Sequence, residues 1–331
     1  MPWKGEKDPY KIWLSEIILQ QTRVEQGLDY YKRFINKYPD IKRLAATPDE
    51  KVFKLWEGLG YYTRCRNLIA TARFIAKELN GKFPDNYEAI RSLKGIGPYT
   101  AAAISSFAFN LPHAVVDGNV FRVLARISGV TIPVDSSKGK KYFASLAEEL
   151  LDKKQPGIYN QTIMDFGAVV CKPVAPLCSQ CIFKKHCFAF LNNKVNLLPV
   201  KEKKISIRKR WFYYFIMEHK NEVLLHRRNG KDIWQGLYEF PLIESGKELN
   251  EQELLRYLKK RKWLRDKADE ITGISLVSKQ QLSHQLIAGQ FIKLLMKQRP
   301  DLGEDWFWIK KEKAKRFPFP RFINQYMKGS L

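Results

Sequence analysis

Two nearby stretches of the sequence combine an anion-binding turn with a lone carboxylate. Leu93–Ala102 reads Leu-Lys-Gly-Ile-Gly-Pro-Tyr-Thr-Ala-Ala, which predicts a helix end, a tight turn and a new helix. Gly95 and Gly97 can both take positive φ at little cost, as so short a turn usually demands. The free N–H groups and the dipole of the new helix can then bind a phosphate. Asp117 follows within Val-Asp-Gly-Asn-Val, so the pattern indicates chemistry on a nucleic acid.

Four of the five cysteines lie in one short segment and predict a metal centre. Cys171, Cys178, Cys181 and Cys187 have the spacing C-x6-C-x2-C-x5-C. Thiolates are soft ligands, so zinc and an iron–sulfur cluster are the candidates. Zinc sites usually offer two C-x2-C pairs, whereas only one such pair exists here, so the spacing favours a cubane cluster. We expect the remaining cysteine, Cys65, to be a small packing residue of a helix.

The charge of the chain points to a polyanionic partner. The 331 residues include 58 lysines and arginines against 34 aspartates and glutamates, a net charge of +24. We favour nucleic-acid binding over a merely basic surface, and such binding should weaken as salt rises. Lys184 and Lys185 lie between Cys181 and Cys187, where they could contact phosphates. No apolar run reaches membrane-spanning length and no signal pattern is present, so we expect a cytoplasmic protein, nucleoid-associated if bacterial.

The elements that must position these groups are helical in the first part of the chain. Apolar residues at helical spacing predict helices from Pro9 to about Leu150. After the first helix, the expected helices cover Pro48–Leu55, Arg64–Leu79, Tyr87–Leu93, Thr100–Phe109, Val120–Ser128 and Lys138–Leu151. Glycines and prolines separate them. The length of the chain favours two domains.

A basic segment and a change of period mark the second domain. Asn192–Arg210 is read as an exposed linker, which either follows a nucleic-acid backbone or is a solvated tether. After it, Trp211–Met217 and Val223–Arg227 predict a β-hairpin. Further strands are expected at Ile274–Val277, Leu286–Phe291 and Trp306–Ile309, and helices at Gln252–Leu258 and Pro320–Met327. The pattern therefore predicts a mainly α first domain and an α+β second domain.

The combined motifs resemble a known superfamily. The helix–glycine turn–helix, the Val-Asp-Gly-Asn-Val stretch and the cysteine spacing are similar to the helix-hairpin-helix DNA glycosylases with an iron–sulfur cluster, the endonuclease III superfamily. Within it, the chain resembles the adenine DNA glycosylases of the MutY type over essentially its whole length. The matching stretches include Asp8–Glu16, Leu19–Thr22, Trp56–Tyr62 and Met164–Gly167.

This resemblance implies an organisation, a cofactor and a partner. It implies a helical catalytic region over 1–191, with the hairpin at 92–103 and the cluster loop at 171–187. A basic linker over 192–209 and a MutT-like (Nudix-like) domain over 210–331 that recognises 8-oxoguanine would follow. The implied cofactor is a [4Fe–4S] cluster. The implied partner is double-stranded DNA containing A:8-oxoguanine or A:G mispairs, with no membrane partner, and the implied state is a monomer.

Two carboxylates fit the reaction that the resemblance implies. Breaking a base–sugar bond develops positive charge on the sugar and negative charge on the leaving base, which asks for one proton donor and one ionised stabiliser. Asp117 is the natural stabiliser or transient nucleophile. Glu16 lies among apolar residues, and burial would raise its pKa and keep a proton available. The residues alone favour a surface glutamate, and the match to the family's Ser-Glu segment reverses that preference; by resemblance Glu16 protonates adenine N7.

Tyr99 discriminates between two kinds of glycosylase. Bifunctional relatives have a lysine at this position, whose amine forms a Schiff base and drives strand cleavage. A tyrosine cannot do this, so we expect a monofunctional enzyme. By resemblance, Tyr99 and Asn119 line the site and hold Asp117 or the water. The alternative for Tyr99 is a packed aromatic residue at a helix start.

The resemblance also assigns residues that contact DNA. The adenine must leave the base stack to be reached. By resemblance, Gln20, Gln21 and Thr22 face the gap that it leaves. Tyr61 would wedge into the duplex, with core packing as its alternative and as our preferred reading of the neighbouring Tyr62. Trp3 and Gln161 fall at positions that contact the flipped adenine.

The second domain matches the family's lesion-reading loop in two of three residues. By resemblance, Ser283 and His284 hydrogen-bond N7–H and O8 of 8-oxoguanine, whereas Leu282 departs from the phenylalanine that is usual at its position. No Arg-Glu-x-x-Glu-Glu follows Gly236–Pro241, so we expect a binding module and no Mg²⁺-dependent hydrolase. The family also has a helix before Trp3, so we expect either an earlier start or a shortened variant.

Three functions stay open at this point. The first is the adenine glycosylase. The second is a bifunctional glycosylase and lyase for pyrimidine lesions, against which Tyr99 and the second domain argue. The third is a non-catalytic iron–sulfur protein that binds DNA, against which the pair of Glu16 and Asp117 argues.

Overall fold

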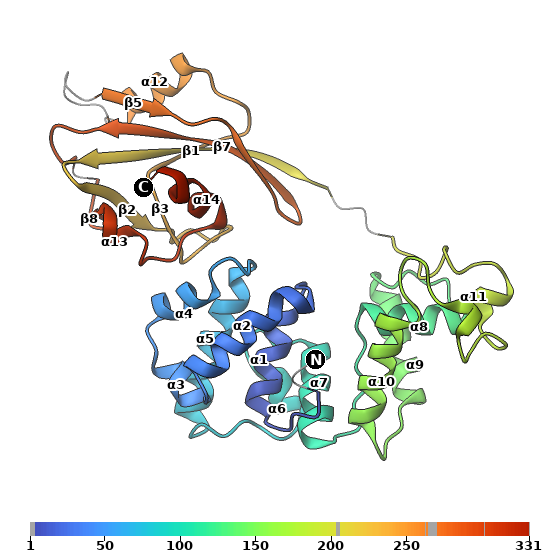
Figure 1. Cartoon of the computed structure of the whole chain (residues 1–331). Helices are drawn as coiled ribbons and strands as arrows, with labels where there is room; N and C mark the ends of the chain where they lie inside the picture. Colours follow the sequence, from blue (N-terminus) through green and yellow to red (C-terminus); the bar gives the residue numbers. More distant parts are fainter. Residues whose placement is uncertain (1–3, 203–205, 262, 264–269, 301, 331) are drawn as a thin grey trace. The chain divides into compact units, whose positions relative to one another are not determined.

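The computed structural model describes residues 4–202, 206–261, 263, 270–300 and 302–330 (Figure 1). The chain divides into two units. The first consists of Met1–Thr47 and Arg66–Lys204, and the second of Pro48–Cys65 and Ile205–Leu331. The predicted domain limits of 1–191, 192–209 and 210–331 stay predictions.

The first unit is helical. Its elements are α1 (Pro9–Leu19), α2 (Val24–Lys37), α3 (Ile41–Ala46), most of α5 (Tyr62–Glu78), α6 (Tyr87–Ser92), α7 (Pro98–Phe109), α8 (Gly118–Ser128), α9 (Ser137–Leu150), α10 (Pro156–Val169), the 3₁₀ turn η1 (Cys178–Gln180) and α11 (Phe188–Leu191). Helix α1 packs against α2 and α7, and α10 packs against α7 and α8. Helix α7 therefore contacts both α1 and α10, which are distant from each other in the sequence.

Short polar residues and glycine set the limits of the helices that matter most. Asp8 caps α1 by accepting a hydrogen bond from the Tyr10 N–H at 2.9 Å, and Pro9 occupies the first turn, where its missing N–H costs nothing. Asp117 caps α8, which ends at Gly129 in the left-handed region. Such caps satisfy backbone groups that the helix itself leaves unpaired.

A mixed β-sheet forms the body of the second unit. Its strands are β1 (Arg208–His219), β2 (Glu222–Arg227), β3 (Tyr238–Glu239), β4 (Leu242–Ser245), β5 (Glu270–Ile274), β6 (Ser278–Gln281), β7 (Gln285–Leu295) and β8 (Trp306–Lys310). Along the main path the order is β3-β2-β1-β7-β5, while β4 pairs with β1, β6 with β7 and β8 with β2. Strands β1 and β7 are parallel, with Arg208 aligned to Gln285. The other pairs are antiparallel.

Helices cover both faces of this sheet (Figure 1). The helices of the unit are α4 (Asp49–Trp56), α12 (Glu251–Lys260), α13 (Lys311–Ala314) and α14 (Arg321–Ser330). Tyr213 packs in one apolar cluster with Leu254 of α12. Its neighbour Tyr214 reaches Phe322 of α14, with ring centroids 6.3 Å apart. Successive strand side chains point to opposite faces, so α12 and α14 lie on opposite faces. A helical first domain and a second domain that combines helices with a sheet were predicted, and this part of the fold class is confirmed.

Helix α4 belongs to the second unit because the C-terminal loops bond to it and to the residue that follows it. The Phe319 N–H donates to Glu57 Oε1 at 2.8 Å, and Lys54 Nζ donates to the Phe317 carbonyl at 3.1 Å. The sequence pattern predicted this helix with limits one residue away, but it did not predict its place in the second unit.

One predicted strand is wrong in its limits. Ile274–Val277 was expected as a strand, yet β5 ends at Ile274 and β6 begins at Ser278. Ser275 explains the interruption, because its N–H donates to the Phe291 carbonyl and its Oγ accepts from the Phe291 N–H, both at 2.9 Å. A serine hydroxyl that bonds the backbone competes with the regular ladder. Leu276 is left 90% exposed in the connection.

The expected exposed linker is attached to the helical unit in its first part. Leu198 is 3% exposed, and its carbonyl accepts from Arg126 Nε at 3.1 Å. The Val134 N–H donates to the Val200 carbonyl at 3.0 Å. The prediction of an exposed linker is therefore wrong at Leu198, whereas Lys194 and Leu197 are exposed as predicted. Lys203 and Lys204 lie outside the described residues. In the described part of the chain, no helix combines the length and apolarity that crossing a membrane requires.

Candidate functional site

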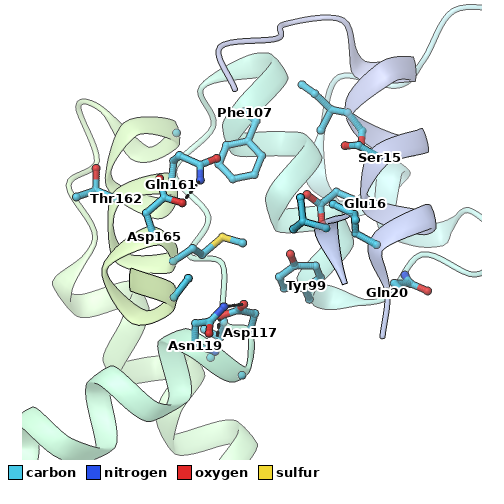
Figure 2. Close-up of a pocket in the computed structure, with 18 of the residues that line it drawn as sticks. Ser15, Glu16, Gln20, Tyr99, Phe107, Asp117, Asn119, Gln161, Thr162 and Asp165 are labelled. Atoms are coloured by element: carbon cyan, nitrogen blue, oxygen red, sulfur yellow. Dashed lines mark hydrogen bonds between the residues drawn. The ribbon is translucent and has the colours of Figure 1, made fainter. Parts of the chain in front are cut away.

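A cavity of about 760 Å³ opens among α1, α7, α8 and α10 of the first unit. Four of the predicted site residues that line it are Glu16, Tyr99, Asp117 and Asn119. Figure 2 shows Glu16 beside Tyr99 on one wall, Gln161 and Asp165 on the opposite wall, and Asp117 with Asn119 at the base. A space of this size is large enough for a ligand of several rings.

Glu16 is a buried carboxyl group on one wall of the cavity. Its side chain is placed by α1, whose apolar residues pack in the core, and Glu16 itself is only 8% exposed. Burial raises the pKa of Glu16 to about 7, because a charged carboxylate is poorly solvated there; a hydrogen bond with Tyr99 opposes the shift and the negative Asp117 adds to it. A carboxyl group with this pKa is protonated in about half of the molecules at neutral pH. The predicted burial of Glu16 is confirmed, and its role as the acid stays a prediction.

The glycine turn places Tyr99 at the first turn of α7. Gly95 adopts φ +81°, and a Cβ there would lie 2.7 Å from Asn67 Cβ, so glycine is required. Gly97 instead caps the helix at φ −92°, so the expectation of positive φ at both glycines is wrong for Gly97. Gly97 needs only an extended backbone, because Pro98 begins the helix directly after it. Burial and the neighbouring carboxyl of Glu16 raise the pKa of Tyr99 well above its ordinary value, so its hydroxyl keeps its proton.

Asp117 is a carboxylate supported by several donors. Its Oδ1 accepts the N–H groups of Asn119 and Val120, both at 2.8 Å, and its Oδ2 accepts the Asn119 side-chain amide at 2.8 Å. Burial raises the pKa of Asp117 above its ordinary value, and these hydrogen bonds limit the rise. One hydrogen bond favours the ionised form of Glu16, whereas three favour that of Asp117. Different surroundings of this kind separate the protonation of two carboxyl groups.

Arg122 connects Asn119 to the cysteine segment, and this connection was not predicted from the sequence. Arg122 Nη2 donates to Asn119 Oδ1 at 2.8 Å and Nε donates to the Cys171 carbonyl at 2.7 Å. The signal was present, because residues three apart on a helix share a face. Gly167 allows this approach, since a Cβ there would lie 2.7 Å from Asn119 Cβ.

The opposite wall carries a chain of polar groups. Gln161 Nε2 donates to Asp165 Oδ1 at 3.0 Å, and Asp165 Oδ2 forms an ion pair with Lys4 at 2.5 Å. Gln161 was predicted from the sequence and Asp165 was not, although the two lie four apart on α10 and so share a face. Trp3 lies outside the described residues.

The predicted DNA-facing residues after α1 line the cavity. Gln20 ends α1 and donates through Nε2 to Thr100 Oγ1 at 3.2 Å, while Gln21 has φ +54°. Thr22 also lines the cavity. The structure therefore brings Gln20, Gln21 and Thr22 together with Glu16, and their contact with DNA stays a prediction.

The four clustered cysteines line one small cavity. Arg126, which is 3% exposed, donates to Cys171 Sγ at 3.4 Å, and its carbonyl lies 3.4 Å from Cys187 Sγ. A buried guanidinium compensates the negative charge of thiolates, so these residues fit a group held by four thiolates. Within the described ranges, no three histidine, cysteine or acidic side chains converge on a single metal ion. Four cysteines around one cavity would suit a cluster of several iron atoms rather than a single ion. Cys65 is fully buried in α5, as expected for a packing residue.

Other predicted contact residues are exposed. Lys184 and Lys185 lie at the surface of the cysteine loop. In the second unit, Tyr61 is 43% exposed with φ +48°, and its hydroxyl contacts Ser283 Oγ. His284 is also exposed. Tyr62 is only 6% exposed, so the preference for core packing at this position is confirmed.

Comparisons with known proteins match both parts of the chain. The model of the HhH-GPD superfamily base excision DNA repair proteins matches residues 14–157, and that of the NUDIX domain matches residues 212–329. Among solved structures, a thermostable thymine-DNA glycosylase aligns with a TM-score of 0.54 and 32% identity over 58% of this chain and 88% of that one. An endonuclease III–DNA covalent intermediate aligns with a TM-score of 0.51 and 23% identity over 57% of this chain and 87% of that one, which shows the fold alone.

Two curated relatives carry the same name. The adenine DNA glycosylase of Mus musculus is 41% identical over 199 residues, which cover 57% of this chain and 39% of that protein. The adenine DNA glycosylase of Buchnera aphidicola subsp. Baizongia pistaciae is 36% identical over 291 residues, which cover 86% of this chain and 78% of that protein. Because the similarity to the Buchnera protein extends over most of both chains, the protein belongs to the adenine DNA glycosylase family.

Proposed function

We propose that this protein removes adenine mispaired with 8-oxoguanine or guanine from duplex DNA, by hydrolysis and without cutting the strand. Family membership makes the chain a DNA glycosylase, a hydrolase of N-glycosyl bonds. The observation that carries the finer proposal is the pair of carboxyl groups in one cavity. Glu16 has a pKa of about 7, and Asp117 is bonded by three donors.

Glu16 would act as the acid in bond cleavage. A flipped adenine enters the cavity, and the protonated Glu16 gives its proton to N7 while the electrons of the C1′–N9 bond move onto the base. The resulting carboxylate then accepts a proton from the water that attacks C1′. The products are adenine and an abasic site, and Glu16 recovers its proton.

Asp117 would stabilise the sugar. Positive charge develops at C1′ and the ring oxygen as the base departs, and an ionised carboxylate nearby lowers the energy of that state. Asn119 and the α8 N-terminus hold the Asp117 carboxylate in place. Their donors also favour its ionised form.

Tyr99 supports the assignment of a monofunctional enzyme. Strand cleavage through a Schiff base needs an amine at this position, and a phenol supplies none. The hydrogen bond between Tyr99 and Glu16 instead gives the tyrosine a role in orienting the acid.

The cysteine segment would hold a [4Fe–4S] cluster through Cys171, Cys178, Cys181 and Cys187. Bound there, the cluster would supply a structural cross-link of the loop. Lys184 and Lys185, both exposed on this loop, would then meet phosphates with little loss of conformational freedom. The net charge of +24 supports a DNA partner.

The second unit would read the base opposite the adenine. The Ser283 hydroxyl and the His284 imidazole are short, exposed polar groups at a turn, and they can pair with N7–H and O8 of 8-oxoguanine. Tyr61, whose hydroxyl contacts Ser283, would enter the duplex beside that base. The monomeric state and the cytoplasmic location stay predictions.

Excision from defined duplexes tests this function. Duplexes with A opposite 8-oxoguanine, A opposite G, T opposite G, and thymine glycol are incubated with the protein and resolved before and after alkali. We expect breaks only after alkali and only at the adenine. Breaks without alkali would indicate a lyase, release of thymine would indicate a pyrimidine glycosylase, and no product would indicate a binding protein. Glu16→Gln is the matched control, which should bind the first duplex without excision.

A further inference from the structure

An arginine whose N–H groups all form hydrogen bonds lies beside the turn that carries Ser283 and His284. Arg210 of β1 is 4% exposed. Its Nε and Nη2 donate to Glu244 at 2.7 and 2.5 Å, and its Nη1 and Nη2 donate to Asp232 at 2.9 and 2.6 Å. Its remaining bond runs from Nη1 to Gln285 Oε1 at 2.9 Å. A guanidinium has five N–H donors, so every one of them is used.

The two carboxylates fix the direction in which the arginine points. Glu244 and Asp232 each accept two bonds, and such paired bonds define both position and plane of a guanidinium. The ring of Phe212 lies 4.8 Å below it, which adds a cation–π contact. Rotation of Arg210 would break several bonds of a buried charge, which is costly. The donor aimed at Gln285 therefore stays in place.

Gln285 closes the turn on the other side. Its carbonyl accepts from the Leu282 N–H at 2.7 Å, so Ser283 and His284 form the tip between these two residues. The His284 carbonyl accepts from the Arg208 N–H at 3.0 Å. The backbone of the tip is thus tied to β1 on one side, while Gln285 is tied through its side chain to Arg210.

We propose that Arg210 and Gln285 are positioning residues for base reading, which hold the Leu282–Gln285 turn so that Ser283 and His284 face the base opposite the adenine. This inference rests on the proposed function of that turn. Leu282 has no aromatic ring to stack on a base, so the orientation of the two polar side chains carries more of the discrimination. Small displacements of a hydrogen-bonding group cost large factors in rate.

Substitution of Gln285 tests the inference without disturbing the buried charges. Gln285→Leu removes the acceptor for Arg210 Nη1, whereas Gln285→Glu keeps an acceptor oxygen there. Gln290→Leu is the matched control, because Gln290 lies on the same strand and loses one bond, to the Ser275 carbonyl at 3.2 Å. For the full chain, single-turnover rate constants are measured with A opposite 8-oxoguanine and A opposite G, together with the melting temperature.

The ratio of the two rate constants decides the outcome. We expect Gln285→Leu to lower the ratio by about fivefold, and Gln285→Glu and Gln290→Leu to retain it. An unchanged ratio, or an equal fall with both duplexes, would overturn the inference. The double variant Ser283→Ala, His284→Ala separates the function of the turn in base reading from its support by Arg210 and Gln285. If it lowers the ratio while Gln285→Leu does not, the turn reads the base but needs no support from Arg210. If it leaves the ratio unchanged, the proposed function of the turn fails as well.

Discussion

The side-chain amide of Asn119 donates to Asp117 Oδ2 at 2.8 Å, while its carbonyl oxygen accepts from Arg122 Nη2 at 2.8 Å. The two bonds fix the orientation of the amide, because a flipped amide would place two donors against each other at Arg122. Asn119 therefore presents a donor to the carboxylate at the base of the cavity. Arg122 in turn is bonded to the Cys171 carbonyl, so the position of Asp117 depends on a contact with the cysteine segment.

Replacement of this asparagine should slow the reaction more than it weakens binding. We expect Asn119→Leu to lower the single-turnover rate constant by about 100-fold, as the loss of one positioned donor does elsewhere. Binding of an uncleavable duplex should change by less than about threefold, because phosphate contacts dominate affinity. Asn192→Leu, at an exposed helix end, is the control. A normal rate in Asn119→Leu would remove the amide from the support of Asp117.

The rate should fall as pH rises through about 7. Glu16 must carry a proton to act as an acid, and burial raises its pKa to about 7. The rate constant should therefore fall about tenfold per pH unit above that point. Asp117 must be ionised, so a second fall is expected on the acid side, and both limbs belong to the coupled pair. Single-turnover rates between pH 5 and 9 check this; a flat profile would exclude Glu16 as the acid.

Tyr99→Phe should move the alkaline limb to higher pH. The hydrogen bond from Tyr99 lowers the pKa of Glu16, and phenylalanine keeps the apolar surroundings without that bond. The carboxyl group should then hold its proton more tightly. The pH profile of the variant is compared with that of the wild type. A limb that stays in place, or that moves to lower pH, would mean that the tyrosine does not donate to Glu16.

The helices and the turn of the site were predictable from the sequence, whereas the contacts between its distant residues were only partly predictable. Helix spacing and the glycine turn indicated α1 and α7, because periodic apolar residues and turn chemistry are local signals. The approach of Glu16, Tyr99 and Asp117 to one cavity came from resemblance, since residues so far apart meet only through tertiary packing.

Dependence on tertiary packing also explains why the contacts of Arg126 and Arg210 were not predicted. Arg126 reads as an ordinary helical arginine, and its role beside Cys171 depends on where the cysteine segment folds back. Arg210 was read as part of a basic linker, yet it is buried because Asp232 and Glu244 come from distant parts of the chain. Neither pairing leaves a local pattern. At Gly97 the local prediction was wrong. Positive φ was expected because glycine tolerates it, yet this residue has an ordinary negative φ.

Loss of one clustered cysteine should remove iron from the purified protein. Cys178 and its three partners line one cavity, and a cubane held by three thiolates is less stable than one held by four. We expect Cys178→Ala to reduce iron and sulfide content and the visible absorbance of the cluster. Cys65→Ala, in a buried packing position, should retain both. Zinc in place of iron, or unchanged iron in Cys178→Ala, would contradict the assignment of the cluster.

The buried carboxyl group should also make the stability of the fold depend on pH. Glu16 has a pKa of about 7 in the folded chain and 4.5 as its ordinary value, so the contribution of its protonated form is complete below 4.5 and is lost as pH rises through 7. The difference corresponds to about 3 kcal/mol. The free energy of unfolding of Glu16→Gln, relative to the wild type, should therefore rise by up to about this amount between pH 4 and pH 8. Denaturant unfolding at both pH values measures it, and Glu25→Gln, at an exposed position, serves as control. A difference that is the same at both pH values would show that Glu16 is solvated in the folded chain.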